Sequence, residues 1–260
     1  MSRARRRWGH GWFAREHAGI SGWGLLLAAV ALIGLGGVYY VVSQQPQAEA
    51  TTPSSTLAAT EAPIAPITMP IALILGDSNT VGTTASTSSK RWTTLVATEL
   101  GWREANYAVS GTGYAATSGV TGCGRTFCAN YQGSLSAAVA DGVEADIVVV
   151  TGGSNDGGRW NDDPELMAGA IDATFLAVQQ AYPDAEIVAI GVPWIGEPMQ
   201  WEKDFDGAVE GSVGGVGGTF VSLIDPPLLE DLALGVGDGA HLNDKGHAAV
   251  AARIVNALQE

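Results

Sequence analysis

Residues 71–79 read IALILGDSN, so five apolar residues lead directly into a glycine and three polar side chains. A continuous run of Ile, Leu and Ala without polar alternation is typical of a strand in a parallel sheet, because helices cover both faces of such a sheet. The turn after such a strand lies at the carboxyl edge of the sheet, where open α/β folds bind their ligands. This stretch therefore predicts a buried strand that ends at a candidate site.

Strand-like and helix-like segments alternate from residue 71 to the C-terminus. The expected strands are 71–75, 105–109, 146–151, 186–190 and 219–224, and the expected helices are 90–100, 133–140, 164–181 and 244–258. Such alternation predicts a doubly wound, three-layer α/β/α sandwich around a five-stranded parallel sheet of the flavodoxin-like kind, formed by residues 70–260. We expect Asn243 to cap the last helix. The segment 193–218 is long and glycine-rich, and we expect it to lie at the site entrance and to influence specificity.

Small and polar residues follow the ends of the predicted strands. They form the blocks Gly76-Asp77-Ser78-Asn79, Ser110-Gly111-Thr112-Gly113, Gly152-Gly153-Ser154-Asn155-Asp156 and Asp238-Gly239-Ala240-His241. Because the carboxyl ends of parallel strands meet at one edge of a sheet, we expect these blocks to converge. Asp156 is interpreted as a helix cap or a brace for a loop.

A serine hydroxyl needs a neighbouring base before it can act as a nucleophile. Of the four histidines, only His241 and His247 follow residue 70, and Asp238 lies three residues before His241. That spacing allows the carboxylate to orient the imidazole. We therefore predict Ser78 as nucleophile, His241 as base and Asp238 as orienting acid. His247 lies inside the last predicted helix and is interpreted as a packing or surface residue.

The four blocks resemble, in kind and order, those of the SGNH hydrolase superfamily, also called GDSL-type esterases and lipases. The resemblance covers essentially all of residues 71–260. It implies an oxyanion hole formed by the backbone N–H groups of Ser78 and Gly111 and the side-chain amide of Asn155. Asn79 departs from the pattern, since many members have leucine there, and this puts the substrate class in doubt more than the catalysis.

The resemblance implies an extracellular carboxylic-ester hydrolase that acts through an acyl-enzyme on small, acetyl-type esters of carbohydrate or lipid. Two alternatives stay open: an O-acyltransferase with the same triad, and a catalytically silent binding domain. Candidate substrate contacts are Asp77, Asn79, Trp160 and Trp194, although helix packing is the alternative for both tryptophans. We expect no cofactor, and no metal, because two histidines and two cysteines are few for a dedicated zinc site.

Cys123 and Cys128 are the only cysteines of the chain. In an oxidising compartment they could close a short disulfide loop, whereas free thiols are the alternative. Because this loop follows Gly111, we expect the bridge to shape one wall of the active-site mouth.

The N-terminus differs from the rest of the chain in charge and hydropathy. Five of the 13 basic residues lie within residues 1–21, and residues 20–42 contain no charged side chain. A stretch of this length is long enough to span a bilayer as a helix. The arginines predict a cytoplasmic tail at 1–19, a signal anchor at 20–42 and an extracellular domain in the cell membrane. The alternatives are secretion after cleavage near Ala50 and a buried core helix.

Residues 43–69 are rich in Pro, Ser, Thr and Ala and predict an extended linker. The chain after residue 21 holds 26 acidic and eight basic residues. Because this excess of negative charge repels phosphate backbones, we do not expect a nucleic-acid partner. The expected partners are an acyl-ester substrate and, through the N-terminal helix, a membrane; the oligomeric state stays open.

Overall fold

The computed structural model describes residues 16–17, 20–21 and 68–260. The chain divides into two units, residues 1–64 and 65–260. In the first unit, strands β1 (Glu16–His17) and β2 (Ile20–Ser21) pair antiparallel. The first two residues of the expected membrane segment thus lie in a strand. The rest of that segment, the basic tail before β1 and the linker up to residue 67 lie outside the described residues. Among the residues that are described, no helix has the length and apolar character needed to cross a bilayer.

The second unit contains a five-stranded, fully parallel sheet, as the sequence predicts. Its spatial order is β4-β3-β5-β6-β7, so the chain starts near one edge, moves out to β4 and then crosses to the other side. The strands are β3 (Ile71–Leu75), β4 (Arg103–Asn106), β5 (Ile147–Thr151), β6 (Glu186–Ile190) and β7 (Thr219–Val221). This order brings the ends of β3, β4 and β5 together, and with them three of the four polar blocks.

The two edge strands differ from their predicted bounds. β4 begins two residues before the expected start and ends at Asn106, although the N–H groups of Tyr107 and Val109 still donate to the carbonyls of Ile74 and Gly76. β7 ends at Val221, because the hydroxyl of Ser222 turns to the carboxylate of Asp206 and accepts backbone N–H groups from the next turn. Edge strands have only one neighbour, so local side-chain bonds decide where they stop.

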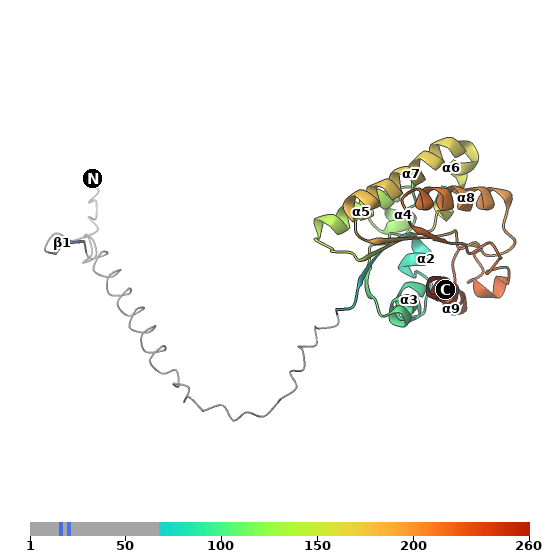
Figure 1. The fold of residues 1–260 in the computed structure, drawn as a ribbon, viewed down its shortest axis with the longest axis horizontal. Coiled ribbons are helices and arrows are strands. Elements are labelled where there is room, and N and C mark those ends of the chain that lie inside the picture. Colours follow the sequence, from blue (N-terminus) through green and yellow to red (C-terminus); the bar gives the residue numbers. More distant parts are fainter. Residues whose placement is uncertain (1–15, 18–19, 22–67) are drawn as a thin grey trace, which may run out of the picture. The chain divides into compact units, whose positions relative to one another are not determined.

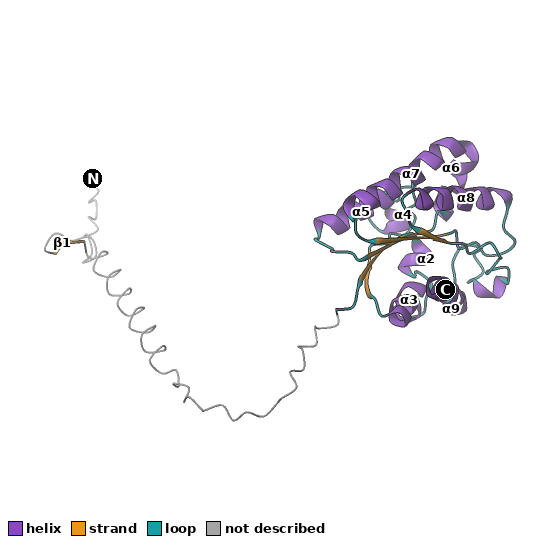
Figure 2. Ribbon diagram, in the orientation of Figure 1, coloured by secondary structure: helices purple, strands orange, loops and turns teal. Residues whose placement is uncertain are grey.

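Helices cover both faces of the sheet, which gives the expected three layers (Figures 1 and 2). The longer helices are α3 (Trp92–Leu100) and α9 (Asp244–Gln259) on one face, and α5 (Tyr131–Ala140), α7 (Pro164–Ala181) and α8 (Gln200–Gly215) on the other. The short ones are α2 (Ser78–Val81), α4 (Val120–Cys123), α6 (Gly157–Asp162), η2 (Ser88–Lys90), η3 (Ser154–Asp156) and η4 (Leu232–Leu234).

Cap residues explain several of the helix starts. Asn130 accepts the N–H of Gly133, so α5 starts two residues earlier than expected. Asn243 caps α9 as predicted, accepting the N–H groups of Lys245 and Gly246. Side-chain acceptors at these positions satisfy N–H groups that have no partner within the helix.

Alternate residues of each central strand enter two separate hydrophobic cores. In β3, Leu73 and Leu75 pack toward α5, α7 and α8, whereas Ala72 and Ile74 pack toward α3 and α9. Side chains of a strand point alternately to opposite faces, so a fully apolar strand is required when both faces are covered. This is the physical basis of the IALIL run.

The glycine-rich segment 193–218, in which the sequence predicted no helix, contains one. Residues 200–215 form α8, despite four glycines in this helix. Glycine lowers helix propensity by about 1 kcal/mol per residue relative to alanine. Here Phe205, Val209 and Val213, spaced four residues apart, are fully or almost fully buried against the sheet. Burial of this stripe offsets the weak propensity, and the i, i+4 spacing is the sequence signal that would have identified the helix.

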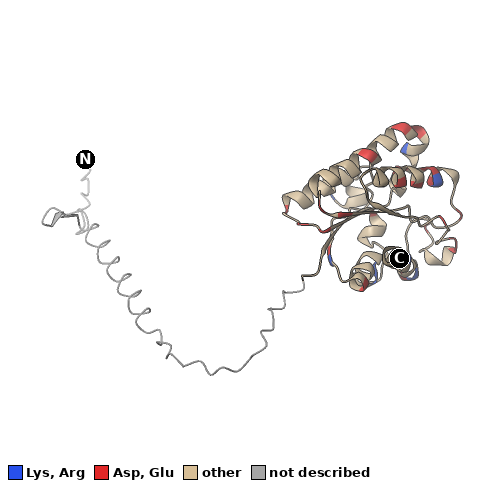
Figure 3. Cartoon of the chain, viewed as in Figure 1, with Lys and Arg blue, Asp and Glu red and all other residues tan. Residues whose placement is uncertain are grey.

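Acidic residues are spread over the helices of both helical layers (Figure 3). Residues 70–260 contain 24 acidic and eight basic residues. The surface of the second unit is therefore strongly negative.

Candidate active site

Ser78 is the first residue of α2, immediately after β3. The side chain of Asp77 caps this short helix, with Oδ1 accepting the N–H of Asn79 at 3.0 Å. Ser78 is half-buried, so its hydroxyl lies at the carboxyl edge of the sheet with access to solvent. Its own backbone N–H lies at a helix N-terminus, where such groups have no intrahelical acceptor and are free to bind an anion.

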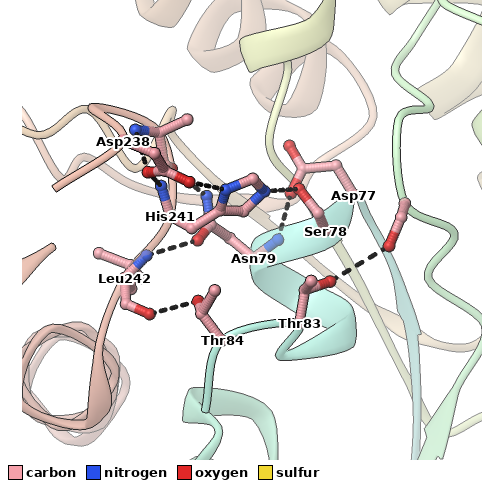
Figure 4. Close-up of polar contacts among 10 residues, drawn as sticks. Asp77, Ser78, Asn79, Thr83, Thr84, Asp238, His241 and Leu242 are labelled. Atoms are coloured by element: carbon pink, nitrogen blue, oxygen red, sulfur yellow. Dashed lines mark hydrogen bonds and ion pairs between the residues drawn. The ribbon is translucent and has the colours of Figure 1, made fainter. Parts of the chain in front are cut away.

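Ser78, His241 and Asp238 are hydrogen-bonded in series (Figure 4). Ser78 Oγ lies 2.9 Å from His241 Nε2, and His241 Nδ1 lies 2.6 Å from Asp238 Oδ2. A carboxylate at Nδ1 keeps the proton on that nitrogen, so Nε2 is left to accept the serine proton. The sequence thus predicted a set of side chains that the fold brings together from the two ends of the domain.

Asp238 is held as a carboxylate by three hydrogen bonds. Besides the imidazole, it accepts the backbone N–H groups of Ala240 and His241 through Oδ1, each at 2.9 Å. The bond from the His241 side chain, followed by those two N–H groups, lowers the pKa of Asp238 far below its ordinary range. The backbone next to His241 thus binds the same carboxylate that orients the His241 imidazole.

Asn79 connects the serine to the histidine loop. Its Nδ2 donates to the carbonyl of Ala240 at 2.9 Å, and its Oδ1 accepts the N–H of Leu242 at 3.0 Å (Figure 4). Thr84 adds a bond from Oγ1 to the carbonyl of Leu242 at 2.6 Å. The sequence suggested that Asn79 contacts a substrate. Instead, Asn79 is only 3% exposed and positions the His241 loop from inside the protein.

Asp77 is also interior. It is 1% exposed, and among the residues that the structure describes its Oδ2 has no hydrogen-bond partner. Desolvation raises the pKa of Asp77 to about 6, against the opposing bond from the Asn79 N–H. The structure therefore places Asp77 beneath the serine turn, where it caps α2, and not at a surface that a substrate could contact.

Gly111 and Asn155 are the other two oxyanion donors implied by the resemblance. Gly111 lies in a turn and Asn155 in η3, and these two segments are hydrogen-bonded to each other. The φ of Gly111 is +78°, a left-handed conformation that favours glycine. Asn155 Nδ2 donates to the carbonyl of Thr112 at 3.0 Å, which uses one of its two N–H bonds. The second N–H remains available for another acceptor.

Trp160 and Trp194 belong to an aromatic cluster at the start of α8. Trp160 packs edge-on against Phe205 with centroids 5.2 Å apart, and Trp194 packs edge-on against Trp201 at 6.0 Å. Trp194 Nε1 also donates to the carbonyl of Glu197 at 3.2 Å. Both rings are half-buried, so helix packing accounts for the contacts that the structure gives them.

Cys123 and Cys128 form a disulfide, as expected, and the segment that precedes Cys123 lies close to Gly111. A Cβ placed on Gly111 would lie 3.2 Å from Cβ of Ser118 and 3.5 Å from Cα of Gly122. Ser118 and Cys128 pair as an antiparallel bridge at the base of this loop. Ser118 and Gly122, which precede the disulfide loop, thus lie beside Gly111, and the role of the bridge as a wall of the active-site mouth stays a prediction.

His247 is a packing residue, as predicted. It is fully buried, and its Nδ1 accepts the N–H of Trp92 at 3.4 Å. Burial lowers its pKa to about 4, so the ring is neutral near pH 7.

A hydroxyl, an imidazole and a carboxylate bonded in series at the carboxyl edge of a parallel sheet are the arrangement of a serine hydrolase. The model of the GDSL-like lipase/acylhydrolase family matches residues 74–249, and the chain belongs to this family. It is thus an ester-hydrolysing serine hydrolase of the SGNH type.

Known relatives agree with this family. The chain is 32% identical over 193 residues to GDSL lipase Rv0518 of Mycobacterium tuberculosis (strain ATCC 25618 / H37Rv), a match that covers 71% of this chain and 79% of that protein. Two solved structures share the fold. Est24, a carbohydrate acetylesterase from Sinorhizobium meliloti, has a TM-score of 0.56 at 17% identity and covers 73% of this chain and 98% of its own. An extracellular lipase from Streptomyces rimosus has a TM-score of 0.52 at 16% identity, with coverage of 72% and 99%.

Proposed function

We propose that the protein hydrolyses carboxylic esters through an acyl-enzyme on Ser78. The observation that carries this proposal is the series of bonds from Ser78 Oγ to His241 to Asp238, at 2.9 and 2.6 Å. His241 Nε2 takes the hydroxyl proton as Oγ attacks the ester carbonyl. The resulting imidazolium is stabilised by the Asp238 carboxylate.

The tetrahedral intermediate carries a negative oxygen, which the backbone N–H groups of Ser78 and Gly111 and the free N–H of Asn155 stabilise. Losing one such donor commonly costs about 3 kcal/mol of transition-state stabilisation. Collapse of the intermediate releases the alcohol, which takes its proton from His241. A water molecule then attacks the acyl-enzyme, with His241 again as base, and frees the acid and Ser78.

The proposed substrates are small, acetyl-type esters of carbohydrate or lipid. Est24 is a carbohydrate acetylesterase and Rv0518 is a GDSL lipase, so the relatives support both classes of alcohol. The excess of acidic over basic residues in the second unit, 24 against eight, disfavours polyanionic substrates and suits neutral ones.

We further propose that the enzyme acts outside the cytoplasm, carried there by residues 20–42 as an anchor or as a cleaved signal. The Cys123–Cys128 disulfide supports this proposal, because such bonds persist in oxidising compartments. Protease treatment of intact cells that produce the full chain tests it. Digestion of the domain is expected, and complete protection until the cells are lysed would contradict it.

Labelling with a fluorophosphonate tests the chemistry. Wild-type protein should be labelled at Ser78, and Ser78→Ala should not. Folded wild-type protein that fails to label would overturn the proposal and favour a silent binding domain. A series of p-nitrophenyl esters of increasing chain length then measures acyl preference, and product analysis with added glycans distinguishes hydrolysis from acyl transfer.

A further inference from the structure

Asp156 is a buried carboxylate that accepts hydrogen bonds from three consecutive backbone N–H groups. Oδ2 accepts the N–H of Tyr114 at 2.7 Å, and Oδ1 accepts those of Ala115 at 3.2 Å and Ala116 at 2.8 Å. The residue is 0% exposed and lies 40 to 42 positions from its partners in the sequence. Although Asp156 is the N-cap of α6, its side chain makes no capping bond there, so bracing the loop is its role.

The braced loop is the one that carries Gly111. Gly113 approaches the carboxylate so closely that a Cβ on it would lie 2.6 Å from Cγ of Asp156. Asn155, the residue before Asp156, donates to the carbonyl of Thr112 at 3.0 Å. Residues 155 and 156 thus bind residues 112 to 116 through four hydrogen bonds, and both proposed donors other than Ser78 depend on this contact.

The charge of Asp156 is compensated locally. Burial raises its pKa, while the N–H groups of Ala116, Tyr114 and Ala115 and the charge of Arg159 oppose that effect. Bonds from several N–H groups to a buried carboxylate are stronger than bonds between neutral groups, so they restrict the loop more firmly than an amide would.

We propose that Asp156 is a positioning residue of the oxyanion hole, which holds the Gly111 N–H and the Asn155 amide at a fixed separation. This inference rests on the proposed function of that site. Asp156 touches neither the substrate nor the reacting atoms. Its effect is on the transition state, because the oxyanion needs its donors fixed before charge develops, whereas the ground-state ester has little charge to bind.

Asp156→Asn tests the proposal. Asparagine has one acceptor oxygen, and its NH2 group would face a backbone N–H, so at least one of the three bonds is lost. We expect kcat for p-nitrophenyl acetate to fall about 10- to 100-fold while KM changes little. Affinity for phenylboronic acid should fall in parallel, because its tetrahedral adduct with Ser78 places a negative oxygen in the same position.

Asp206→Asn is the matched control. Asp206 is also a buried carboxylate, 5% exposed, and it accepts the N–H of Val192 at 3.1 Å and the hydroxyl of Ser222 at 3.0 Å. Its neutralisation should leave kcat and boronate affinity within about twofold of the wild type. An equal loss of kcat in both variants would show a general effect of buried charge and would overturn the proposal, as would wild-type kcat and boronate affinity in folded Asp156→Asn.

Gly113→Ala provides a second variant in case Asp156→Asn does not fold. It keeps the carboxylate but forces the loop away from it, and the same loss of kcat and boronate affinity is expected. Gly207→Ala is its control, because a Cβ there meets no atom within 4 Å. Wild-type kcat in Gly113→Ala would refute the inference. Wild-type protein that neither hydrolyses esters nor reacts with fluorophosphonate would instead refute the proposed function, so the two failures are distinct.

Discussion

Asn79 binds the backbone on both sides of His241, donating to the carbonyl of Ala240 and accepting the N–H of Leu242. The loop of the base is thereby attached to the residue that follows the nucleophile, through Leu242, which lies 163 positions from Asn79 in the sequence. This side chain therefore links the segment that carries Ser78 directly to the loop that carries His241. The position where many GDSL-type members have leucine is thus occupied here by a bridge between two parts of the site.

Asn79→Leu removes both bonds with little change in volume. The two backbone groups are left unsatisfied, so we expect a loss of about 1–3 kcal/mol in the free energy of unfolding. Release of the histidine loop should lower kcat about 10- to 100-fold, since small misplacements of a catalytic group are costly. Urea denaturation and ester kinetics measure the two effects. Thr84→Val removes only the neighbouring bond to Leu242 and should lose less unfolding free energy and less kcat. An unchanged kcat in folded Asn79→Leu would show that the Asn79 bonds do not position His241.

Asp238→Asn should abolish most of the activity without unfolding the protein. An amide NH2 facing Nδ1 favours the tautomer with its proton on Nε2, which can no longer accept the serine proton, and such losses reach about 10⁴-fold in kcat. Asp244→Asn is the matched control, because Asp244 is also strongly hydrogen-bonded but to Ser86 and Lys90. Single-turnover kinetics should show full activity for this control. Similar kcat values for the two variants would argue against Asp238 as the orienting acid.

Glu202→Gln should stabilise the protein at neutral and alkaline pH. Burial, with one oxygen unpartnered, raises the pKa of Glu202 from 4.5 to about 7. The folded state therefore binds this proton more tightly than the unfolded state, and the free energy of unfolding falls as pH rises between these values. At pH 8 the neutral variant should gain about 2 kcal/mol over the wild type, and the gain should vanish near pH 4.

Thermal unfolding of both proteins across pH 4–8 checks this prediction. Asp204→Asn, on the exposed side of the same helix, is the control and should show no comparable gain. A pH-independent difference between Glu202→Gln and the wild type would mean that the substitution acts through packing and not through the buried charge.

Reduction of the Cys123–Cys128 bond should lower activity more than stability. The loop that it closes is largely exposed, with Phe127 65% accessible, and it begins directly after Gly122, which lies beside Gly111. A disulfide in so short a loop contributes only about 2 kcal/mol in the chain-entropy model. We expect kcat to fall about threefold to tenfold in dithiothreitol, from displacement of one oxyanion donor. The double variant Cys123→Ser/Cys128→Ser should be equally impaired and insensitive to dithiothreitol. Full activity in this variant would show that the disulfide does not hold Gly111 in place.

The central strands and the longest helix could be read from the sequence with little error. Strands 71–75 and 186–190 and helix 164–181 have the predicted bounds, because their signals are local: an unbroken apolar run, or an apolar stripe with a capping Asp163. The triad residues were also predictable, since each follows a strand or precedes a helix whose place in the sheet follows from chain order.

The tertiary structure alone decided how these residues are held. Asn79 and Asp77 looked like substrate contacts in the sequence, yet both are buried, and Asn79 reaches a loop 161 positions away. The hydrogen bonds from the backbone of residues 114–116 to Asp156 likewise join segments that are far apart in the sequence. A hydrogen bond between distant segments leaves no periodicity in the sequence, because its geometry exists only after the strands have paired. The sequence by itself determined which groups meet at the sheet edge, and the packing of the loops determined how firmly they are fixed there.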